Sequence, residues 1–254
     1  MKIFIINLER VTERKELMLS QIKSNDLIQK SDDLEFIFFE AIDAKQNQHI
    51  KFKNEKQSFL TKIIRGKKLV DGEIACWASH FLLWQKCVEL NEPVVILEDD
   101  VEFLPEFTNG LKEIRESNFE YVRLICTYNK PFKEIKKNFY TSHLGVCGTQ
   151  GYYLTPAAAQ KFLTSAKKWH KPIDDYMDSF WINDVPIIVH IPFLLKDNNA
   201  VESSTIAKRE NKPNIFFKAT REISKIFLRT RKIFYMKIHY SNFINNQIKN
   251  QNIN

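Results

Sequence analysis

The chain has 254 residues, of which 44% are hydrophobic and 13% aromatic, and this composition excludes an intrinsically disordered protein. No apolar run approaches the roughly 20 residues that span a bilayer, and the absence of a standard Gly-rich phosphate loop counts against P-loop and nicotinamide enzymes. The net charge of +7 is unevenly placed: residues 208–254 carry +9 and the first 207 residues carry −2. A mildly acidic body argues against binding to nucleic acid. The four cysteines lack Cys-x-x-Cys spacing and are interpreted as buried free thiols.

Strand and helix patterns alternate along the first 206 residues. Thr12 is the predicted N-cap of the first helix, and Thr155 caps a later one with proline next to it. Strands are predicted at residues 2–8, 36–39, 93–98, 121–126 and 186–192, and helices at 12–22, 73–90, 105–116 and 157–166. Residues 45–69 are expected to form loop with short helical pieces. The alternation predicts one α/β domain with a mostly parallel sheet over residues 1–206, followed by a basic helical tail over residues 207–254.

Three consecutive carboxylates follow the apolar run Val94-Val95-Ile96-Leu97. Such a run is typical of a strand buried on both faces, and Glu98, Asp99 and Asp100 would repel one another at its carboxyl end. A bound divalent cation, Mn²⁺ or Mg²⁺, relieves this repulsion, and open α/β sheets bind ligands at that edge. The alternative is a solvated acidic loop.

The residues after the first two strands indicate which substrate and reaction the cation would assist. A carboxylate-bound metal at a sheet edge suits a phosphate-bearing substrate, either in hydrolysis of a phosphodiester or in sugar transfer from a nucleotide. Asn7, Arg10 and Arg14 follow the first strand and favour transfer, because a guanidinium group binds a diphosphate well. Alternatively, the two arginines pair with the glutamates that precede them. Asp43 could bind a ribose or uracil, or act as a turn residue.

Six motifs in this order resemble glycosyltransferase family 25, and together they cover roughly residues 1–206. They are Ile-Asn-Leu-Glu-Arg at 6–10, Phe-Glu-Ala-Ile-Asp at 39–43, Gly-Glu-Ile-Ala-Cys-x-x-Ser-His at 72–80, Ile-Leu-Glu-Asp-Asp-Val at 96–101, Gly-Thr-Gln-Gly-Tyr-Tyr-Leu at 148–154 and Pro-Ile-Asp-Asp-Tyr at 172–176. The resemblance implies a GT-A-type fold and transfer of galactose, or glucose, from a UDP-sugar with inversion to a β-linkage. It also implies a lipid A-core oligosaccharide acceptor, as in lipooligosaccharide or lipopolysaccharide biosynthesis.

The same resemblance assigns roles to individual residues. Glu98-x-Asp100 looks like the metal and donor motif, with Asp100 as the direct metal ligand and Glu98 or Asp99 facing the ribose or reaching the metal through water. The positions implied to line the donor and acceptor region are Ser79, His80, Thr149 and Gln150. Without the motif, His80 would be interpreted as a structural helix residue.

An inverting transfer needs a general base near the acceptor hydroxyl, and a carboxylate is the ordinary choice. Asp174 and Asp175 are the candidates, because adjacent carboxylates in a partly closed site raise one pKa. Alternatively, they are acids in the first turn of a helix, where they favour the helix dipole. The pattern does not choose between the two aspartates.

The tail has apolar residues at helical spacing between lysines and arginines. The apolar set is Phe216, Ile223, Ile226, Phe227, Ile233, Phe234 and Ile238. A cationic amphipathic helix binds anionic lipid surfaces, so the expected location is cytoplasmic, on the inner face of the inner membrane. The alternatives are a helix docked on the protein's own body or an oligomer contact, and one rival function is a membrane-bound adaptor without enzymatic activity.

Overall fold

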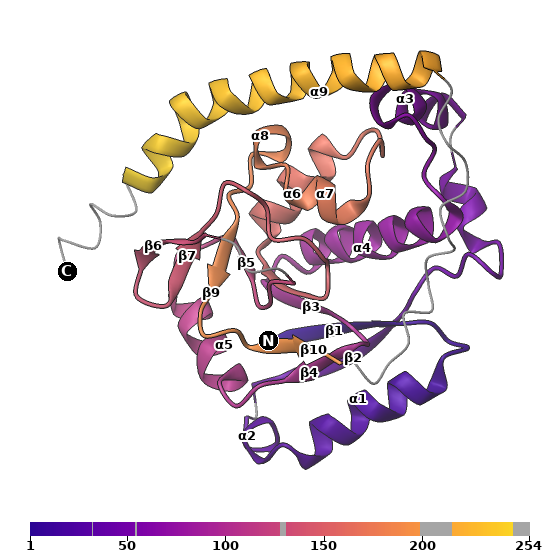
Figure 1. The fold of residues 1–254 in the computed structure, drawn as a ribbon. Coiled ribbons are helices and arrows are strands. Elements are labelled where there is room, and N and C mark those ends of the chain that lie inside the picture. Colours follow the sequence, from indigo (N-terminus) through magenta and orange to yellow (C-terminus); the bar gives the residue numbers. More distant parts are fainter. Residues whose placement is uncertain (32, 54, 128–130, 199–214, 246–254) are drawn as a thin grey trace.

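The centre of the fold is an eight-stranded mixed sheet with strand order β2-β1-β3-β8-β5-β9-β7-β6 (Figure 1). The computed structural model describes residues 1–31, 33–53, 55–127, 131–198 and 215–245. The strands are β1 (Lys2–Asn7), β2 (Glu35–Glu40), β3 (Val94–Glu98), β5 (Tyr121–Arg123), β6 (Lys133–Lys136), β7 (Phe139–Thr141), β8 (Gly151–Leu154) and β9 (Ile188–His190). A second, two-stranded sheet pairs β4 (Val101–Phe103) with β10 (Leu195–Asp197) in antiparallel fashion.

Helices cover both faces of the sheet and give a three-layer arrangement (Figure 1). One face carries α1 (Thr12–Ser24), α2 (Asp26–Gln29) and α5 (Phe107–Glu116), and the other carries α4 (Asp71–Leu90), α6 (Pro156–Ser165), α7 (Ile173–Met177) and α8 (Phe180–Asn183). The connection between β2 and α4 contains the 3₁₀ helix η1 (Gln48–Phe52) and α3 (Glu55–Arg65). Residues of β3 alternate between the two resulting cores, Val95 and Leu97 on one side and Val94 and Ile96 on the other. This burial on both faces explains the uninterrupted apolar run in the sequence.

The predicted α/β class is confirmed, and most strands of the sheet share one direction. Six of the eight strands run the same way, while β8 and β7 run against their neighbours. Strand β8 was not predicted as a strand, although it lies between β3 and β5 at the centre of the sheet. Its four residues are too few to show a period.

Two local predictions need correction and one is confirmed. Thr12 is the first residue of α1 and not its N-cap; that position belongs to Val11, whose backbone N–H binds the Leu8 carbonyl at 2.8 Å in a tight turn. The segment 45–69 contains an 11-residue helix, α3, where only short helical pieces were expected. Thr155 does cap α6, because its side-chain oxygen accepts a hydrogen bond from the Ala158 N–H.

The basic tail forms a long helix, α9 (Ile215–Tyr235), which continues into the π-helical turn η2 (Met236–Tyr240). Figure 1 shows α9 extended across one side of the molecule, over α3 at its beginning and past α8. Tyr240 is buried and stacks on Phe180 of α8 with ring centroids 5.0 Å apart. The predicted boundary at residues 206 and 207 lies outside the described residues. Among the helices that the structure describes, none combines the length and apolar character needed to cross a bilayer.

Candidate functional site

A cavity of about 280 Å³ opens at the carboxyl ends of β1 and β3, beside the beginning of α4. Eleven of the residues predicted from the sequence line it: Arg10, Arg14, Asp43, Ser79, His80, Glu98, Asp99, Asp100, Thr149, Gln150 and Asp174. Parallel strands end at one edge of a sheet, so side chains distant in the sequence meet there. Two predicted residues, Asn7 and Asp175, are not in the described lining of this cavity.

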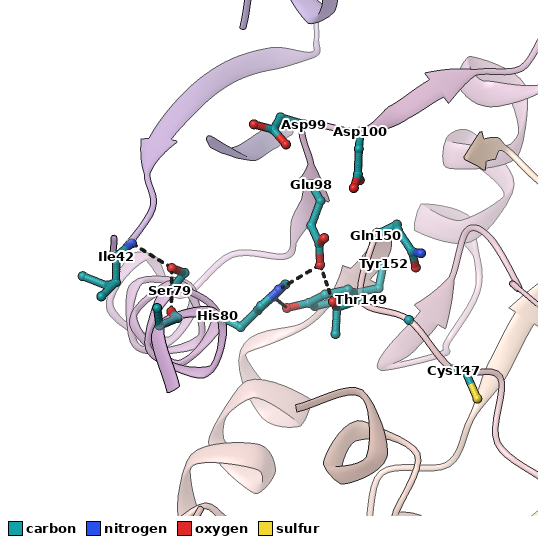
Figure 2. A network of polar contacts seen from close by, with 12 residues as sticks. Ile42, Ser79, His80, Glu98, Asp99, Asp100, Cys147, Thr149, Gln150 and Tyr152 are labelled. Carbon is teal, nitrogen blue, oxygen red and sulfur yellow. Dashed lines mark hydrogen bonds and ion pairs between the residues drawn. The ribbon is translucent and has the colours of Figure 1, made fainter. Parts of the chain in front are cut away.

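The three consecutive acids do not act as a unit, because Asp99 turns away from the other two (Figure 2). Its two carboxylate oxygens accept hydrogen bonds from Asn7 Nδ2 at 2.6 Å and from Arg14 Nη1 at 2.9 Å. Burial raises the pKa of Asp99, against the opposing effect of these two bonds. Asp99 thereby ties the end of β3 to the end of β1 and the first turn of α1. Arg14 is thus an ion-pair partner of Asp99.

Glu98, the last residue of β3, is held by side chains from α4 and from the segment before β8 (Figure 2). Its Oε1 atom accepts a hydrogen bond from the Thr149 hydroxyl and lies 3.4 Å from His80 Nε2. Burial acts to raise the pKa of Glu98, but the contacts with His80 and Thr149 and the charge of Arg123 outweigh it. The pKa therefore lies below its ordinary value, and Glu98 is a fixed, ionised carboxylate at the cavity wall.

A buried chain of hydrogen bonds orients His80. The Trp84 indole N–H donates to the Tyr152 hydroxyl oxygen at 3.0 Å, and that hydroxyl lies 2.8 Å from His80 Nδ1. Within the described part of the chain, Nδ1 is the acceptor in reach of the Tyr152 proton. With Nδ1 accepting from Tyr152, the His80 hydrogen on Nε2 is directed toward Glu98. Tyr152 and Trp84 are thus positioning residues that the sequence patterns did not single out.

Replacing Tyr152 by phenylalanine is expected to lower activity at this site by about 10- to 100-fold. The change removes the acceptor of the Trp84 N–H and the donor to His80, so that the imidazole no longer has one fixed orientation toward Glu98. The measurement is kcat and KM for the reaction proposed below. Tyr153→Phe is the matched control, because Tyr153 comes from the same strand but packs in the opposite core. Equal activities of the two variants would contradict the positioning role.

Two residues that line the cavity, Asp100 and Gln150, each carry a buried oxygen atom without a hydrogen-bond partner among the described residues. These atoms are Asp100 Oδ1 and Gln150 Oε1. Asp197, at the end of β10, accepts a hydrogen bond from Gln150 Nε2 at 3.2 Å, and the N–H of residue 198 binds the Asp100 carbonyl at 2.8 Å. Asp197 was missed because β10 is a three-residue strand without a period. These oxygen atoms make a set that suits a hard divalent cation.

Without a cation, the negative charges of Glu98 and Asp99 surround Asp100. Burial, then the negative charges of Glu98 and Asp99, raise the pKa of Asp100 to about 7. Burial followed by the charge of Glu98 also raises the pKa of Asp197. Asp100 ionises only reluctantly at neutral pH because of its buried, negatively charged surroundings. A cation bound beside it would stabilise its ionised form.

The raised pKa of Asp100 predicts how stability depends on pH in metal-free protein. Between the ordinary value of 3.8 and about 7, the folded protein keeps a proton that the unfolded chain releases. This contribution to stability is therefore present at low pH and is lost as the pH rises through about 7. Asp100→Asn removes this pH-dependent contribution. In EDTA, the melting temperature of the variant should therefore exceed that of the native protein at pH 8 and match it near pH 4. A difference that does not change with pH would contradict this prediction.

A rigid loop before β8 presents Thr149 and Gln150 to the cavity. Arg123, which is fully buried, donates hydrogen bonds from Nη2 to the carbonyls of Cys147 and Gly148. Asp178 Oδ2 accepts the N–H groups of Val146 and Cys147 at 3.0 and 2.8 Å. The loop needs glycine at position 148, where φ is +73° and an added Cβ would meet the Gln150 side chain. Arg123 and Asp178 are further positioning residues that sequence patterns did not reveal.

Ser79 and Asp43 form the opposite wall of the cavity. The Ser79 hydroxyl donates to the Ala75 carbonyl at 3.0 Å and accepts the Ile42 N–H at 2.9 Å (Figure 2). Ser79 therefore joins α4 to the segment after β2. Arg10 Nε donates to Asp43 Oδ2 at 2.6 Å, and Asp43 Oδ1 accepts the Lys45 N–H at 2.8 Å. Asp43 is thus a turn residue that also orients an arginine of the cavity wall.

All four cysteines are free thiols, as predicted, but only Cys87 is buried and Cys76, Cys126 and Cys147 are partly exposed. Cys76 lies one helical turn before His80 and lines the cavity. Ligand atoms of Cys76, His80 and Glu98 lie within 4.8 Å of one another. Burial raises the pKa of the Cys76 thiol well above its usual value, and the charge of Glu98 adds to this effect. A protonated thiol is a weak metal ligand, and His80 Nδ1 is already engaged by Tyr152. Among the described residues no other three such ligand atoms lie this close together, so a cation near Asp100 would have to draw on oxygen atoms further apart.

The two candidate bases are placed differently at the start of α7. Asp174 lines the cavity, whereas Asp175 is exposed beside Lys171. Asp175 is exposed as a residue, but partial burial of its carboxyl group, with a further contribution from the charge of Asp174, raises its pKa. Position therefore favours Asp174 as the group that can meet a bound substrate.

The fold and this cavity define an α/β protein with a carboxylate-lined ligand site at the carboxyl edge of its sheet. Residues 1–177 match glycosyltransferase family 25, described as an LPS biosynthesis protein family. The match covers most of the chain and contains all the cavity residues predicted from the sequence. The chain belongs to glycosyltransferase family 25.

Curated relatives agree with this assignment. A procollagen lysyl hydroxylase and glycosyltransferase of Acanthamoeba polyphaga mimivirus is 25% identical over 174 residues, which are 64% of this chain and 19% of that protein. A glycosyltransferase 25 family member of Aedes aegypti is 30% identical over 195 residues, 71% of this chain and 31% of the relative. Procollagen galactosyltransferase 2 of Mus musculus is 29% identical over 119 residues, 45% of this chain and 18% of the relative. The chain thus spans less than a third of each of these relatives.

Proposed function

We propose that this chain transfers a hexose, preferably galactose and otherwise glucose, from a UDP-sugar to a hydroxyl group of a saccharide acceptor. Membership of glycosyltransferase family 25 supports transfer of a sugar, and the name of the Mus musculus relative supports galactose. The observation that carries the proposal is the set of cavity oxygens around Glu98 and Asp100, two of which are buried without a hydrogen-bond partner among the described residues. The proposal includes a GT-A-type arrangement of the donor site.

The cavity fits a divalent cation of the Mn²⁺ or Mg²⁺ type. Asp100 would hold it directly. Glu98 and Gln150, which also line the cavity, and Asp197, which is bonded to Gln150, would supply further oxygen atoms. When bound, such an ion offsets the charge that develops on a departing diphosphate. The fixed orientation of Glu98 by Thr149 and His80 means that this carboxylate needs no rearrangement to take part.

The donor would occupy the side of the cavity between the ends of β1 and β2 and the start of α4. Arg10 and Arg14 line that side, and their guanidinium groups suit the diphosphate. Asp43 lies where a ribose or uracil could donate hydrogen bonds to it. Ser79, His80, Thr149 and Gln150 would surround the sugar and its link to the diphosphate.

The acceptor would approach from the side of Asp174. Its hydroxyl oxygen forms the new bond to the anomeric carbon while the bond from that carbon to the diphosphate oxygen breaks. The electron pair of the broken bond leaves with UDP, and the hydroxyl proton passes to the Asp174 carboxylate. Attack from the face opposite the leaving group inverts the anomeric centre and gives a β-linked product from an α-linked donor.

The proposed acceptor is a lipid A-core oligosaccharide, and the proposed location is the cytoplasmic face of the inner membrane. The description of the family as LPS biosynthesis protein supports the acceptor, and the cationic amphipathic helix α9 supports the location. Loops around the cavity set the linkage and the acceptor structure.

A donor panel tests the proposal. The full chain is incubated with UDP-galactose, UDP-glucose and other nucleotide sugars, with Mn²⁺, Mg²⁺ or EDTA, and with or without truncated lipooligosaccharide. The expected result is metal-dependent formation of a glycosylated acceptor, with UDP release that requires the acceptor. Equal release of nucleotide without any acceptor would instead identify a metal-dependent phosphodiesterase. No turnover and no donor binding would favour the non-enzymatic adaptor.

A further inference from the structure

Helix α9 exposes a continuous apolar stripe. The stripe consists of Ile215, Phe216, Ile223, Ile226, Phe227, Ile233 and Phe234, whose exposed fractions range from 56% to 81%. At about 100° per residue, all seven side chains fall within one third of the helix circumference. Ile238 in η2 follows with an exposed fraction of 55%. Soluble proteins rarely leave so many large apolar side chains together in water.

A different face of α9 packs against the body of the protein. Lys62 of α3 lies over the Phe217 ring at 5.6 Å, and Tyr235 packs on Phe180 of α8 with ring centroids 5.8 Å apart. Lys232 lies 4.6 Å from the Trp181 ring. The docked residues Phe217 and Tyr235 point about 140° away from the centre of the apolar stripe. The helix therefore docks on the body, as one alternative from the sequence expected. Among the described residues, its apolar stripe still remains largely exposed.

A band of positive charge lies along one flank of the stripe. Within residues 215–235, six lysines and arginines face a single acid, Glu222. Lys218, Arg221, Lys225 and Arg229 occupy the arc between the docked face and the stripe. Glu222 is already paired with Arg221 at 2.8 Å and Lys225 at 2.9 Å, all at the surface. The helix therefore offers apolar and cationic surfaces side by side.

We propose that α9 binds the surface of an anionic lipid bilayer, with the stripe at the acyl boundary and the basic band on the headgroup phosphates. A second copy of this helix would match the apolar stripe but would bring two strongly positive bands together. A nucleic acid would match the charge and leave the apolar stripe in water. An anionic lipid surface satisfies both requirements.

This inference is independent of the catalytic proposal, and it has one consequence for it. Arg65, at the end of α3, lies 3.9 Å from Glu73 of the cavity wall, so α3 connects the membrane-binding helix to the cavity. If the acceptor is lipid-linked, as proposed above, binding of α9 would bring the cavity to the surface that carries it.

Vesicle flotation with the full chain tests the inference. Vesicles of phosphatidylcholine alone are compared with vesicles containing about 30% phosphatidylglycerol, at low and high salt. The native protein should float with the anionic vesicles and be released by salt. Phe227→Ser/Phe234→Ser should weaken binding about tenfold or more. Phe59→Ser is the matched control, because Phe59 is equally exposed on α3 but lies outside the stripe, and it should bind like the native protein.

A fluorescence measurement locates the helix directly. Phe227→Trp places an indole on the stripe, and brominated lipids should quench its emission, with the native protein as the blank for the four other tryptophans. Unchanged flotation of the double serine variant, or absence of quenching, would overturn the inference. It would also be overturned by a lipid-free dimer that the double variant abolishes. Transfer to a soluble acceptor should be unaffected in this variant, so failure of the lipid inference is distinguishable from failure of the catalytic one.

Discussion

Asp100→Asn is expected to lower the rate of sugar transfer by about 100-fold or more while leaving the fold intact. A 100-fold loss corresponds to about 2.7 kcal/mol of transition-state stabilisation, within the range for loss of a cation from a diphosphate site. The protein remains folded because Asp100 Oδ1 makes no hydrogen bond to the described residues, and because an amide removes repulsion from Glu98 and Asp99. The measurement is kcat/KM for the UDP-sugar over a range of Mn²⁺ concentrations, together with the melting temperature.

Glu102→Gln is the control for loss of a carboxylate near this turn. Glu102 lies two residues further along, in β4, and pairs with Lys196 of β10 at 2.6 Å outside the cavity. Its activity should remain within about twofold of the native value, since a surface ion pair contributes little. An Asp100→Asn variant with native activity and native metal dependence would remove the basis of the proposed cation site.

The carboxyl edge of the sheet was predictable from the sequence because it depends on strand direction alone. Apolar runs marked β1, β2 and β3, and their polar ends had to meet wherever the strands were parallel. The roles within the acidic turn were not predictable in the same way. Glu98, Asp99 and Asp100 are chemically alike, and only the turn geometry sends Asp99 toward Arg14 and Asp100 toward Gln150.

Long-range pairing placed the residues that the sequence patterns missed. Asp197 contacts Gln150 because β10 pairs with β4 in a register that sets Asp197 opposite Val101, next to Asp100. Arg123 and Asp178 act on a loop that precedes β8, a strand inserted between β3 and β5. None of these contacts follows from spacing along the chain, since each depends on which strands become neighbours.

Sequence patterns also predicted only part of the structure of helix α9. The spacing of apolar residues predicted the helix but not which face would dock, because Phe217 is as apolar as the exposed Phe216. The shapes of α3 and α8 decide this, and they select the face with Phe217 and Tyr235.

Asp99→Ala should destabilise the protein by about 3 kcal/mol, in contrast to Asp100→Asn in the same turn. The Asp99 and Arg14 side chains are each only 9% exposed, and removing Asp99 takes its 2.9 Å ion pair away from the buried Arg14 charge. Asp100 Oδ2, 4.0 Å from Arg14, can compensate only in part. At about 2–4 °C per kcal/mol for a chain of this size, thermal melting should shift down by about 6–12 °C.

A double-mutant cycle separates this ion pair from packing. Arg14→Met in the Asp99→Ala background removes the guanidinium group that has lost Asp99, so the double variant should be more stable than the sum of the two single losses predicts. If the single losses instead add, the pair is not coupled and Asp99 acts only through Asn7. A melting temperature of Asp99→Ala equal to that of Asp100→Asn would contradict the division of this acidic turn into one structural and one ligand-facing aspartate.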